Sequence, residues 1–228
     1  GYKWQKNIFF QDIQIPPEKG VDIKIPWELS RFQFIGQLIK IKDYCPAEIF
    51  MLVVSDWISD NKYQKGVNWR CAMEVSLRSI NWILGLKIFE EELSQKYDFQ
   101  RLISNSLRDH GIYIFNNLEY VSESIPTGNH YLSDIAGLLY ISSHFPEFPE
   151  SDLWLVFSIE QIISEIDRQI LKDGMSHEAS AGYHRLVTEL FLSCACVIEN
   201  IPLTRRIRIL NLNISKYKTF PKIKSENF

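Results

Sequence analysis

Two short segments carry side chains whose types suit one kind of chemistry. The first places the amide of Asn129 next to the imidazole of His130. The second, residues 173–184, is a polar turn rich in small residues that ends with Tyr183 and His184. An amide and an imidazole can neutralise a carboxylate, and a phenol can pass a proton to a departing oxygen. Together these groups suit β-elimination on a uronic-acid polysaccharide, in which a proton beside a carboxylate is removed and a sugar oxygen is expelled.

The first pair also has an ordinary structural role open to it. Asn129 can cap a helix that begins at His130, because asparagine side chains accept hydrogen bonds from the free backbone N–H groups of a helix start. The same helix start favours a bound anion, so the amide can instead hold a uronate carboxylate. The neighbouring proton becomes acidic only when the charge that develops on that carboxylate is stabilised.

The second segment leaves a similar choice open. Tyr183 is either a half-buried tyrosine with a satisfied hydroxyl or an acid that donates its proton to the departing glycosidic oxygen. As a phenolate it would cost about 4 kcal/mol at neutral pH, a cost that His184 or Arg185 would lower. Glu178 precedes this helix and is expected to be a first-turn or capping acid, or to orient an imidazole.

A third set lies on one helical face. Arg78, Asn81 and Trp82 are spaced i, i+3 and i+4, which places them side by side on a helix. One interpretation is a sugar-binding wall, in which the tryptophan stacks on a pyranose ring while the other two hold acid and hydroxyl groups. The other is an exposed ion-pair stripe beside a buried tryptophan. Glu28 and Arg31, three residues apart, are expected to pair in the same way.

Composition excludes several function classes. With 228 residues, 46% of them hydrophobic, the chain is long enough to bury a substantial core. A net charge of -3 gives no global basic field for a nucleic acid, and an acidic polysaccharide, the partner that the chemistry above suggests, would need a local positive cleft instead. No run of eighteen apolar residues occurs, which predicts no membrane span. His177 and His184 lack a third ligand at zinc spacing, so we expect no metal site.

The spacing of apolar residues predicts an all-α fold. Residues 1–26 are expected to form an extended arm, since Val21, Ile23 and Ile25 alternate with polar neighbours. After this arm the period becomes helical, and short loops join long helices as in an array of helical hairpins. Asn68 is placed to cap the third helix. The helices are expected near residues 27–43, 47–61, 69–93, 98–120, 130–144, 151–173 and 181–199.

The end of the chain departs from this helical pattern. Residues 203–228 carry seven Lys or Arg against one acidic residue, so we expect a basic, poorly packed tail. The sequence therefore predicts three parts: the arm, one helical domain over residues 27–202, and the tail.

Four stretches, taken together, resemble a known family. They are WELSR at 27–31, NWRCAMEVSLRSINW at 68–82, GNHYLSDIAGLLY at 128–140 and DGMSHEASAGYHRLVTEL at 173–190. Their order and spacing are similar to the helical N-terminal domain of heparinase II/III-like polysaccharide lyases, a group related to certain alginate lyases. The resemblance implies an incomplete (α/α) toroid of antiparallel helix pairs, followed in the family by an antiparallel β-sandwich. It also implies cleavage of uronate-containing glycans by β-elimination, a carbon–oxygen lyase reaction.

The resemblance implies a role for each catalytic candidate. Asn129 and His130 match the family's adjacent asparagine and histidine and would neutralise the uronate carboxylate. Tyr183 matches the family's tyrosine and would act as general acid, and with some substrates also as general base. The remaining substrate contacts are expected from Arg78, Asn81, Trp82, Glu178 and His184.

The resemblance further implies that part of the active site is supplied from outside these residues. In the family the β-sandwich contributes another catalytic histidine and a structural metal site, so we expect no cofactor in this chain and a cleft that lacks one wall. The basic tail stands where the last toroid helices are expected. The family places the protein in the periplasm or cell envelope, although no signal peptide is visible. The oligomeric state is not predicted.

Two other functions stay open beside the lyase hypothesis. One is a non-catalytic glycan-binding protein, or an assembly protein for cell-envelope polysaccharide, that keeps the helical array. The other is an α-solenoid scaffold for protein interactions, which would have no cleft. The lyase hypothesis leads because one chain carries Asn129, His130 and Tyr183 in a helical context.

Overall fold

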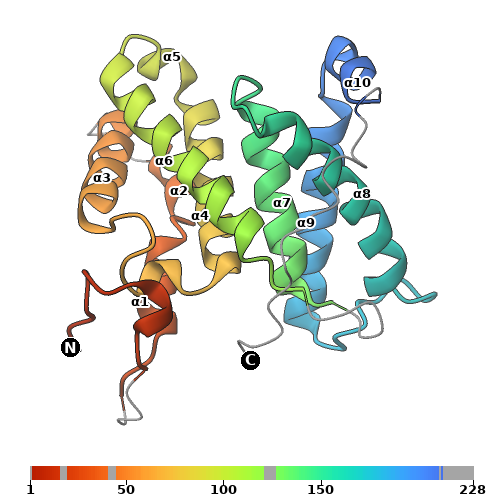
Figure 1. Cartoon of the computed structure of the whole chain (residues 1–228), viewed down its shortest axis with the longest axis horizontal. Coiled ribbons are helices and arrows are strands. Elements are labelled where there is room, and N and C mark those ends of the chain that lie inside the picture. The colour runs from red at the N-terminus through yellow and green to blue at the C-terminus, as the bar shows by residue number, and fades with distance from the viewer. Residues whose placement is uncertain (1, 16–19, 41–44, 121–126, 211, 213–228) are drawn as a thin grey trace. The chain divides into compact units, whose positions relative to one another are not determined.

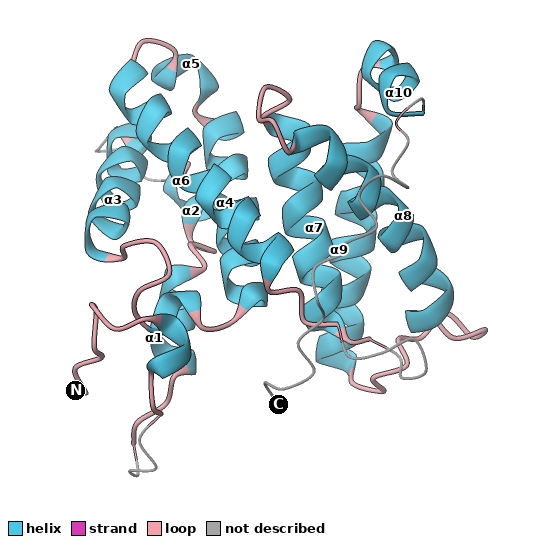
Figure 2. Ribbon diagram, viewed as in Figure 1, coloured by secondary structure: helices cyan, strands magenta, loops and turns pink. Residues whose placement is uncertain are grey.

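The computed structural model shows helices as the regular elements of the chain (Figure 2). It describes residues 2–15, 20–40, 45–120, 127–210 and 212. Within these ranges no strand forms, and β pairing is limited to two isolated bridges, Phe9 with Lys65 and Ile170 with Ser176. The all-α class predicted from the sequence is confirmed.

The chain divides into two compact units, with unit 1 at residues 1–113 and unit 2 at residues 114–228. The elements that begin in unit 1 are η1 (Phe10–Asp12), α1 (Lys24–Ser30), α2 (Ile35–Leu38), α3 (Pro46–Asp60), η2 (Val67–Trp69), α4 (Ala72–Ile88), α5 (Glu90–Leu93) and α6 (Tyr97–Asn116), where η marks a 3₁₀ helix. The elements that begin in unit 2 are α7 (Asn129–His144), α8 (Ser151–Gln169), α9 (Ala181–Glu199) and α10 (Leu203–Leu210) (Figure 1).

The core of unit 1 forms around α4. The residues of α4 from Ala72 to Ile80 are all buried, and α1, α2 and η2 pack against this helix. Gly85 allows the closest approach, because a Cβ at this position would lie 2.5 Å from Cε2 of the fully buried Phe50. The missing side chain therefore lets an aromatic ring lie directly against the helix backbone, as a close-packed core requires.

An ion pair ties the segment after α1 to α4. Arg31 donates through Nε and Nη2 to the two carboxylate oxygens of Glu74, at 2.6 and 2.5 Å. Glu74 is buried, and a bidentate guanidinium satisfies a buried carboxylate at both oxygens. The hydrogen bond to Glu74 raises the pKa of Arg31. The predicted pairing of Arg31 with Glu28 is therefore wrong. Arg31 follows the last residue of the short helix α1 and does not lie on its face.

The start of unit 1 differs from the expected extended arm followed by one helix. α1 already begins at Lys24, and Pro26 lies in its first turn, where a missing N–H removes no intrahelical hydrogen bond. The helix expected over residues 27–43 is interrupted after Ser30. Phe32 has a φ of 60°, and this left-handed backbone cannot continue a right-handed helix.

The helix expected over residues 69–93 is also divided. It begins at Ala72, because the preceding residues form η2, and it ends before Phe89, which separates α4 from α5. Asn68 does not cap it, since the N-cap position is Cys71 and the side-chain oxygen of Asn68 has no hydrogen-bond partner among the described residues.

Unit 2 is built around α7, which packs against both α8 and α9. The residues of α7 from Tyr131 to Ser142 are all buried. The small residues Ser133, Ala136 and Gly137 share one face at helical spacing, which lets neighbouring helices approach closely. The buried hydroxyl of Ser133 is satisfied by the backbone oxygen of the first residue of α7, at 2.8 Å.

The segment expected to be a poorly packed tail begins with a short helix, α10, whose Arg205 is buried while its leucine side chains are exposed. The acceptors of its guanidinium are Ser142 O at 2.7 Å, Ser151 Oγ at 2.7 Å and Asp152 Oδ1 at 3.2 Å. Burial lowers the pKa of Arg205, against the opposing effect of Asp152. Residues 203–210 thus form a helix that is anchored by one buried basic side chain, while the basic tail as a separate part of the chain stays a prediction. Residues 211 and 213–228 lie outside the described part of the chain.

No single helix among the described residues combines the length and the apolar composition of a membrane span. α9 and α10 meet those two criteria only as a pair, and the pair is bent by 98° at the break between them.

Candidate functional site

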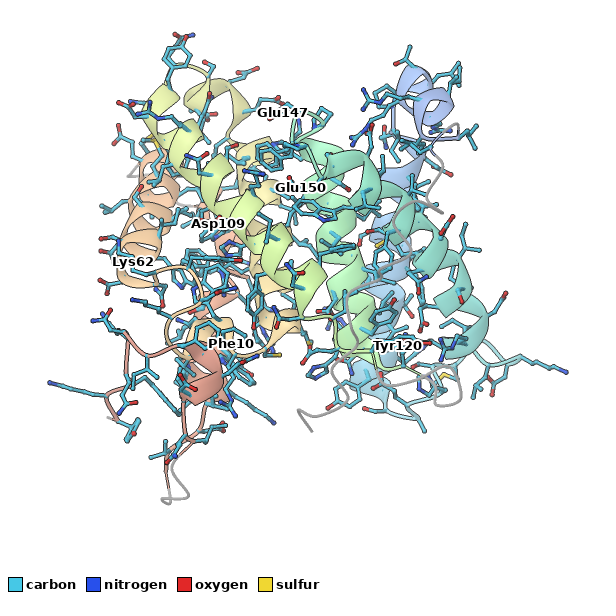
Figure 3. The ribbon with its side chains drawn as sticks, in the orientation of Figure 1. Phe10, Lys62, Asp109, Tyr120, Glu147 and Glu150 are labelled. Atoms are coloured by element: carbon cyan, nitrogen blue, oxygen red, sulfur yellow. The ribbon has the colours of Figure 1, made fainter. Side chains whose placement is uncertain are left out.

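The two segments that carry the catalytic candidates, Asn129-His130 and residues 173–184, meet at one end of unit 2. The start of α7, the last turn of α8 and the start of α9 lie there, at the lower end of Figure 1. The segment that follows α6 also reaches this end, where Figure 3 labels Tyr120, while Glu147 and Glu150 mark the opposite end of the same unit. The residues of interest, called the α7 cluster below, are Glu119, Asn129, His130, Glu178, Tyr183 and His184.

Asn129 is the first residue of α7 and does not cap it. The N-cap position is Gly128, which has no side chain with which to cap the helix. The Asn129 side chain is almost fully buried, and its Nδ2 donates to Glu178 Oε1 at 2.9 Å. The capping role considered for Asn129 is therefore wrong, since its amide is committed to a carboxylate from the turn before α9.

His130 follows Asn129 and is held by a second carboxylate. Its Nδ1 lies 3.0 Å from Glu119 Oε2, and its side chain is 47% exposed. Because a carboxylate only accepts hydrogen bonds, Nδ1 is the protonated nitrogen in this contact. Asp134, one turn further along α7, accepts from the backbone N–H of Glu119 at 2.8 Å. This second bond fixes the segment that carries Glu119 against α7.

Glu119 is the site residue that the sequence reasoning missed. It was expected to lie in the last turn of a helix over residues 98–120, but α6 ends at Asn116. The pair Asn116-Asn117 was the available signal, because asparagine is common where helices end. With the helix ended there, the next residues are free to run toward the start of α7.

The turn before α9 is a small hairpin. Leu171 N donates to Met175 O at 2.8 Å, and Gly174 supplies the positive φ of 86° that the turn needs. The hairpin is tied to the next helix because Ser176 N donates to His184 Nδ1 at 3.3 Å. α8 consequently ends at Gln169, four residues earlier than expected.

Tyr183 lies in the first turn of α9 and is 50% exposed. Its hydroxyl makes no hydrogen bond to the described part of the chain. Tyr131, the other tyrosine of these segments, differs in both respects: it is buried and donates to Gln161 Oε1 at 2.7 Å. Burial and the nearby acid Glu165 raise the pKa of Tyr131. Of the two phenols, Tyr183 is the one available to a ligand.

A buried polar network at the end of α8 holds the segment that leads into α7. Glu165 is fully buried and accepts hydrogen bonds from Thr127, from Gln169 Nε2 at 2.8 Å and from Arg168 at 3.1 Å. Gln169 Nε2 also lies 3.3 Å from the backbone oxygen of Gly128. Paired and hydrogen-bonded in this way, a buried carboxylate can stiffen the backbone it holds. The residue directly before Asn129 is thus fixed by the last turn of α8.

The third predicted set lies in α4 of unit 1, and two of its members are internal. Arg78 and Trp82 are both 0% exposed. The Arg78 guanidinium carbon lies 4.1 Å from the centroid of Trp57, and its Nε donates to His110 Nε2 at 2.9 Å. Burial lowers the pKa of Arg78 to about 9, and nearby acids act in the opposite direction.

This placement does not fit a sugar-binding wall. Arg78 and Trp82 offer no surface to a polysaccharide, and Asn81 donates its amide to the backbone oxygen of Arg31 at 2.8 Å. The i, i+3, i+4 spacing was read correctly as one helical face, but that face points into the core. Glu178 and His184, in contrast, belong to the α7 cluster.

Comparisons with known proteins identify the family to which the chain belongs. The family model "Heparinase II/III N-terminus" matches residues 2–207. A heparin-sulfate lyase of Pedobacter heparinus is 37% identical over 65 residues, which are 28% of this chain and 10% of that protein. A heparin-sulfate lyase of Bacteroides stercoris is 33% identical over 64 residues, again 28% of this chain and 10% of that protein.

Solved structures give the same fold. The crystal structure of a mutant of the heparan sulfate lyase HepC from Pedobacter heparinus matches with a TM-score of 0.62 at 24% identity, over 89% of this chain and 33% of that chain. A second HepC structure from the same organism matches with a TM-score of 0.59 at 23% identity, over 87% and 32%. The chain thus spans about a third of the length of these relatives.

Proposed function

The chain belongs to the heparinase II/III N-terminus family, and from that premise we propose that it is the helical part of a lyase that cleaves uronic-acid-containing glycans by β-elimination. One observation carries the proposal: two adjacent groups able to neutralise a uronate, Asn129 and His130, are each held by a carboxylate. The half-exposed phenol of Tyr183 lies at the same end of unit 2. The relatives named as heparin-sulfate lyases support a glycan of that chemical class as the substrate.

In the proposed reaction, Asn129 donates a hydrogen bond to the carboxylate of the uronate. His130 donates a second one through Nε2–H in the doubly protonated form of its ring, because its Nδ1–H is held by Glu119. This lowers the energy of the charge that moves onto the carboxylate as the C5 proton passes to a base, for which the further histidine of the family's β-sandwich is the proposed candidate. The electron pair of the C5–H bond forms the C4=C5 double bond, and the C4–O glycosidic bond breaks. Tyr183 donates its phenolic proton to the departing oxygen. Where Tyr183 is also the base, its phenolate takes the C5 proton and returns it to that oxygen.

His184 is proposed as a substrate contact beside Tyr183. Its Nδ1 accepts from Ser176 N, so its neutral ring carries the proton on Nε2 and can donate to a sugar hydroxyl. We further propose that the helices form part of an (α/α) toroid and that the protein works in the periplasm or cell envelope, as the resemblance implies.

The test is turnover by this chain joined to the β-sandwich of a family lyase, and by the Tyr183→Phe variant of that joined protein, on a panel of uronate polymers that includes heparan sulfate. Product is measured by the ultraviolet absorbance of the C4=C5 double bond conjugated with the carboxylate. Loss of the phenolic proton should lower kcat about 100-fold or more, because general acid–base catalysis contributes on that scale. Tyr97→Phe is the matched control, since this tyrosine is exposed in unit 1 and bonds only to Gln95 nearby.

The outcomes separate the candidate functions. No product with any uronate polymer, from a joined protein that is folded, contradicts the lyase proposal. Glycan binding without product, equal in the wild type and in Tyr183→Phe, favours the alternative of a glycan-binding or polysaccharide assembly protein.

A further inference from the structure

Glu178 holds the amide of Asn129, and we propose that it is a positioning residue that orients this amide toward the substrate carboxylate. The inference rests on the proposed function, in which Asn129 donates a hydrogen bond to the carboxylate of the substrate. The contact itself is the 2.9 Å hydrogen bond from Asn129 Nδ2 to Glu178 Oε1. The two residues are 49 positions apart in the chain, so the bond also joins the turn before α9 to the start of α7.

The carboxylate of Glu178 is placed for Asn129 rather than for a ligand. Its Oε2 is buried and has no hydrogen-bond partner in the described part of the chain. An oxygen with no exposed surface cannot be reached by a polysaccharide in this structure. The geometry therefore favours positioning over the direct substrate contact expected from the sequence.

Gly128 leaves the space that this carboxylate fills. A Cβ at position 128 would lie 3.0 Å from Glu178 Oε1, so a side chain there would require the carboxylate to shift by a few tenths of an ångström. The backbone oxygen of Gly128 is fixed in turn by Gln169, at 3.3 Å. The start of α7 is thus held on one side by the last turn of α8 and on the other by Glu178.

The turn presents Glu178 from a constrained backbone. His177 N donates to Gln169 O at 2.9 Å, and Ser176 N donates to His184 Nδ1 at 3.3 Å. Ala179, directly after Glu178, has a φ of 51°, a left-handed conformation that costs energy for alanine and persists only where the surroundings fix it. The same turn leads into the helix that carries Tyr183. Glu178 therefore couples the placement of Asn129 to the segment of the proposed acid.

The chemistry of the pair decides which way the amide faces. A carboxylate accepts hydrogen bonds and cannot donate, so it binds the nitrogen of Asn129 and not the oxygen. With one N–H fixed on Glu178, the second N–H has a defined direction and can donate to the uronate. A reversed amide would present its oxygen to the substrate carboxylate and repel it. The negative charge of Glu178 also repels the uronate, so it raises KM while the orientation it enforces raises kcat.

The first measurement needs no turnover. The side-chain N–H signals of Asn129 are identified by NMR from their loss in Asn129→Ser, and their hydrogen exchange is followed in the other variants. In Glu178→Ala we expect the exchange of these protons to speed up about tenfold or more, because a buried bond to a carboxylate is removed. Glu178→Gln keeps an acceptor and should give an intermediate rate. Glu189→Ala, which removes an exposed acid from α9, is the control and should leave the signals unchanged.

The second measurement divides kcat from KM in the joined protein. Glu178→Ala should lower kcat about 10- to 100-fold, on the scale seen when a supporting residue of a reactive group is lost, and it should change little further in the background of Asn129→Ala. Glu178→Gln should recover most of kcat and lower KM, because it keeps the hydrogen bond without the negative charge. A purely structural role predicts losses that add in the double variant and no fall in KM.

Failure of this inference differs from failure of the proposed function. Unchanged Asn129 signals in a folded Glu178→Ala chain, or additive losses of kcat, overturn the positioning role while leaving the lyase proposal standing. Altered signals together with no turnover by the wild-type joined protein on any uronate polymer overturn the lyase proposal, and with it the catalytic meaning of the contact.

Discussion

Unit 1 and unit 2 each gather histidine and aromatic side chains beside other polar groups, but the two groups differ in what encloses them. In unit 1, Arg78 and His110 are 0% exposed and face the ring of Trp57. In unit 2, His130 and Tyr183 each keep about half of their surface in contact with solvent. Similar residue types thus serve as packing in one unit and remain available to a ligand in the other.

The difference shows which property decides a role. Arg78 is enclosed by the ring of Trp57 and by His110, so a substrate would have to displace part of the core to reach it. The α7 cluster instead combines fixed groups with an exposed phenol, which is the arrangement that recognition of a mobile ligand requires. We therefore expect substitutions in the unit 1 group to change stability, and substitutions in the α7 cluster to change turnover.

The largest expected effect on stability is Arg31→Ala. It leaves the buried Glu74 carboxylate without its bidentate partner, and an unpaired buried charge costs about 3–5 kcal/mol. Urea unfolding followed by tryptophan fluorescence measures it, since five of the six tryptophans lie in unit 1. Arg101→Ala, which breaks an exposed pair with Asp98, is the control and should cost less than about 1 kcal/mol. Equal losses in the two variants would remove the contrast between buried and exposed pairs.

Gly85→Ala should come next, with a loss of about 1–3 kcal/mol from overpacking. The new methyl group would meet the Phe50 ring at 2.5 Å, and a buried ring has little room to move. Gly36→Ala in α2 is the matched control, because its Cβ meets nothing within 4 Å, and it should stabilise by up to about 1 kcal/mol through the unfolded state. If the unfolding midpoint of Gly85→Ala equals that of the wild type, the described packing of α4 is wrong.

His110 should make unit 1 sensitive to acid. Burial, followed by the charge of Arg78, lowers the pKa of His110 well below 6.5, so the folded chain keeps a neutral ring while the unfolded chain takes up a proton. Stability is therefore lost as the pH falls below 6.5. When the pH falls by one unit from 6.5, we expect the free energy of unfolding to drop by about 1 kcal/mol because of this group. The measurement is the urea midpoint at both pH values, and His110→Gln should show a shallower pH dependence than the wild type.

Tyr183→Phe should have the smallest effect on stability, within about 0.5 kcal/mol, because the hydroxyl is on a half-exposed ring without a partner among the described residues. The same change is expected to remove turnover. Thermal unfolding of the purified variant checks the first part. A loss of several kcal/mol would mean that Tyr183 supports unit 2, as Arg78 supports unit 1.

Local periodicity predicted the helices of unit 2 well. α9 has the expected bounds, and α7 begins one residue before the expected start. These helices follow from strong apolar spacing and a glycine at the turn. In unit 1 the same reasoning joined α1 to α2 and α4 to α5, because a left-handed residue such as Phe32 leaves no mark in the apolar pattern.

The contacts that define the site could not be predicted in this way. Glu178 reaches Asn129 across 49 residues, and Arg31 reaches Glu74 across 43. Both partners follow from how the helices pack, which local spacing does not encode. The sequence did identify Asn129, His130 and Tyr183 as candidates, because their chemistry fits one reaction, but their roles remain predictions.

Arg205 has a consequence for the lifetime of unit 2. Its hydrogen bond to Ser142 O joins residues 63 positions apart. The helices between them must therefore be brought together before this bond can form. A contact of such long range is expected to form after the folding transition state, and contacts of that kind slow unfolding more than they speed folding. The short helix α10 would then slow the unfolding of unit 2. Arg205→Met should raise the unfolding rate and so shorten the time for which the helices of the α7 cluster stay folded.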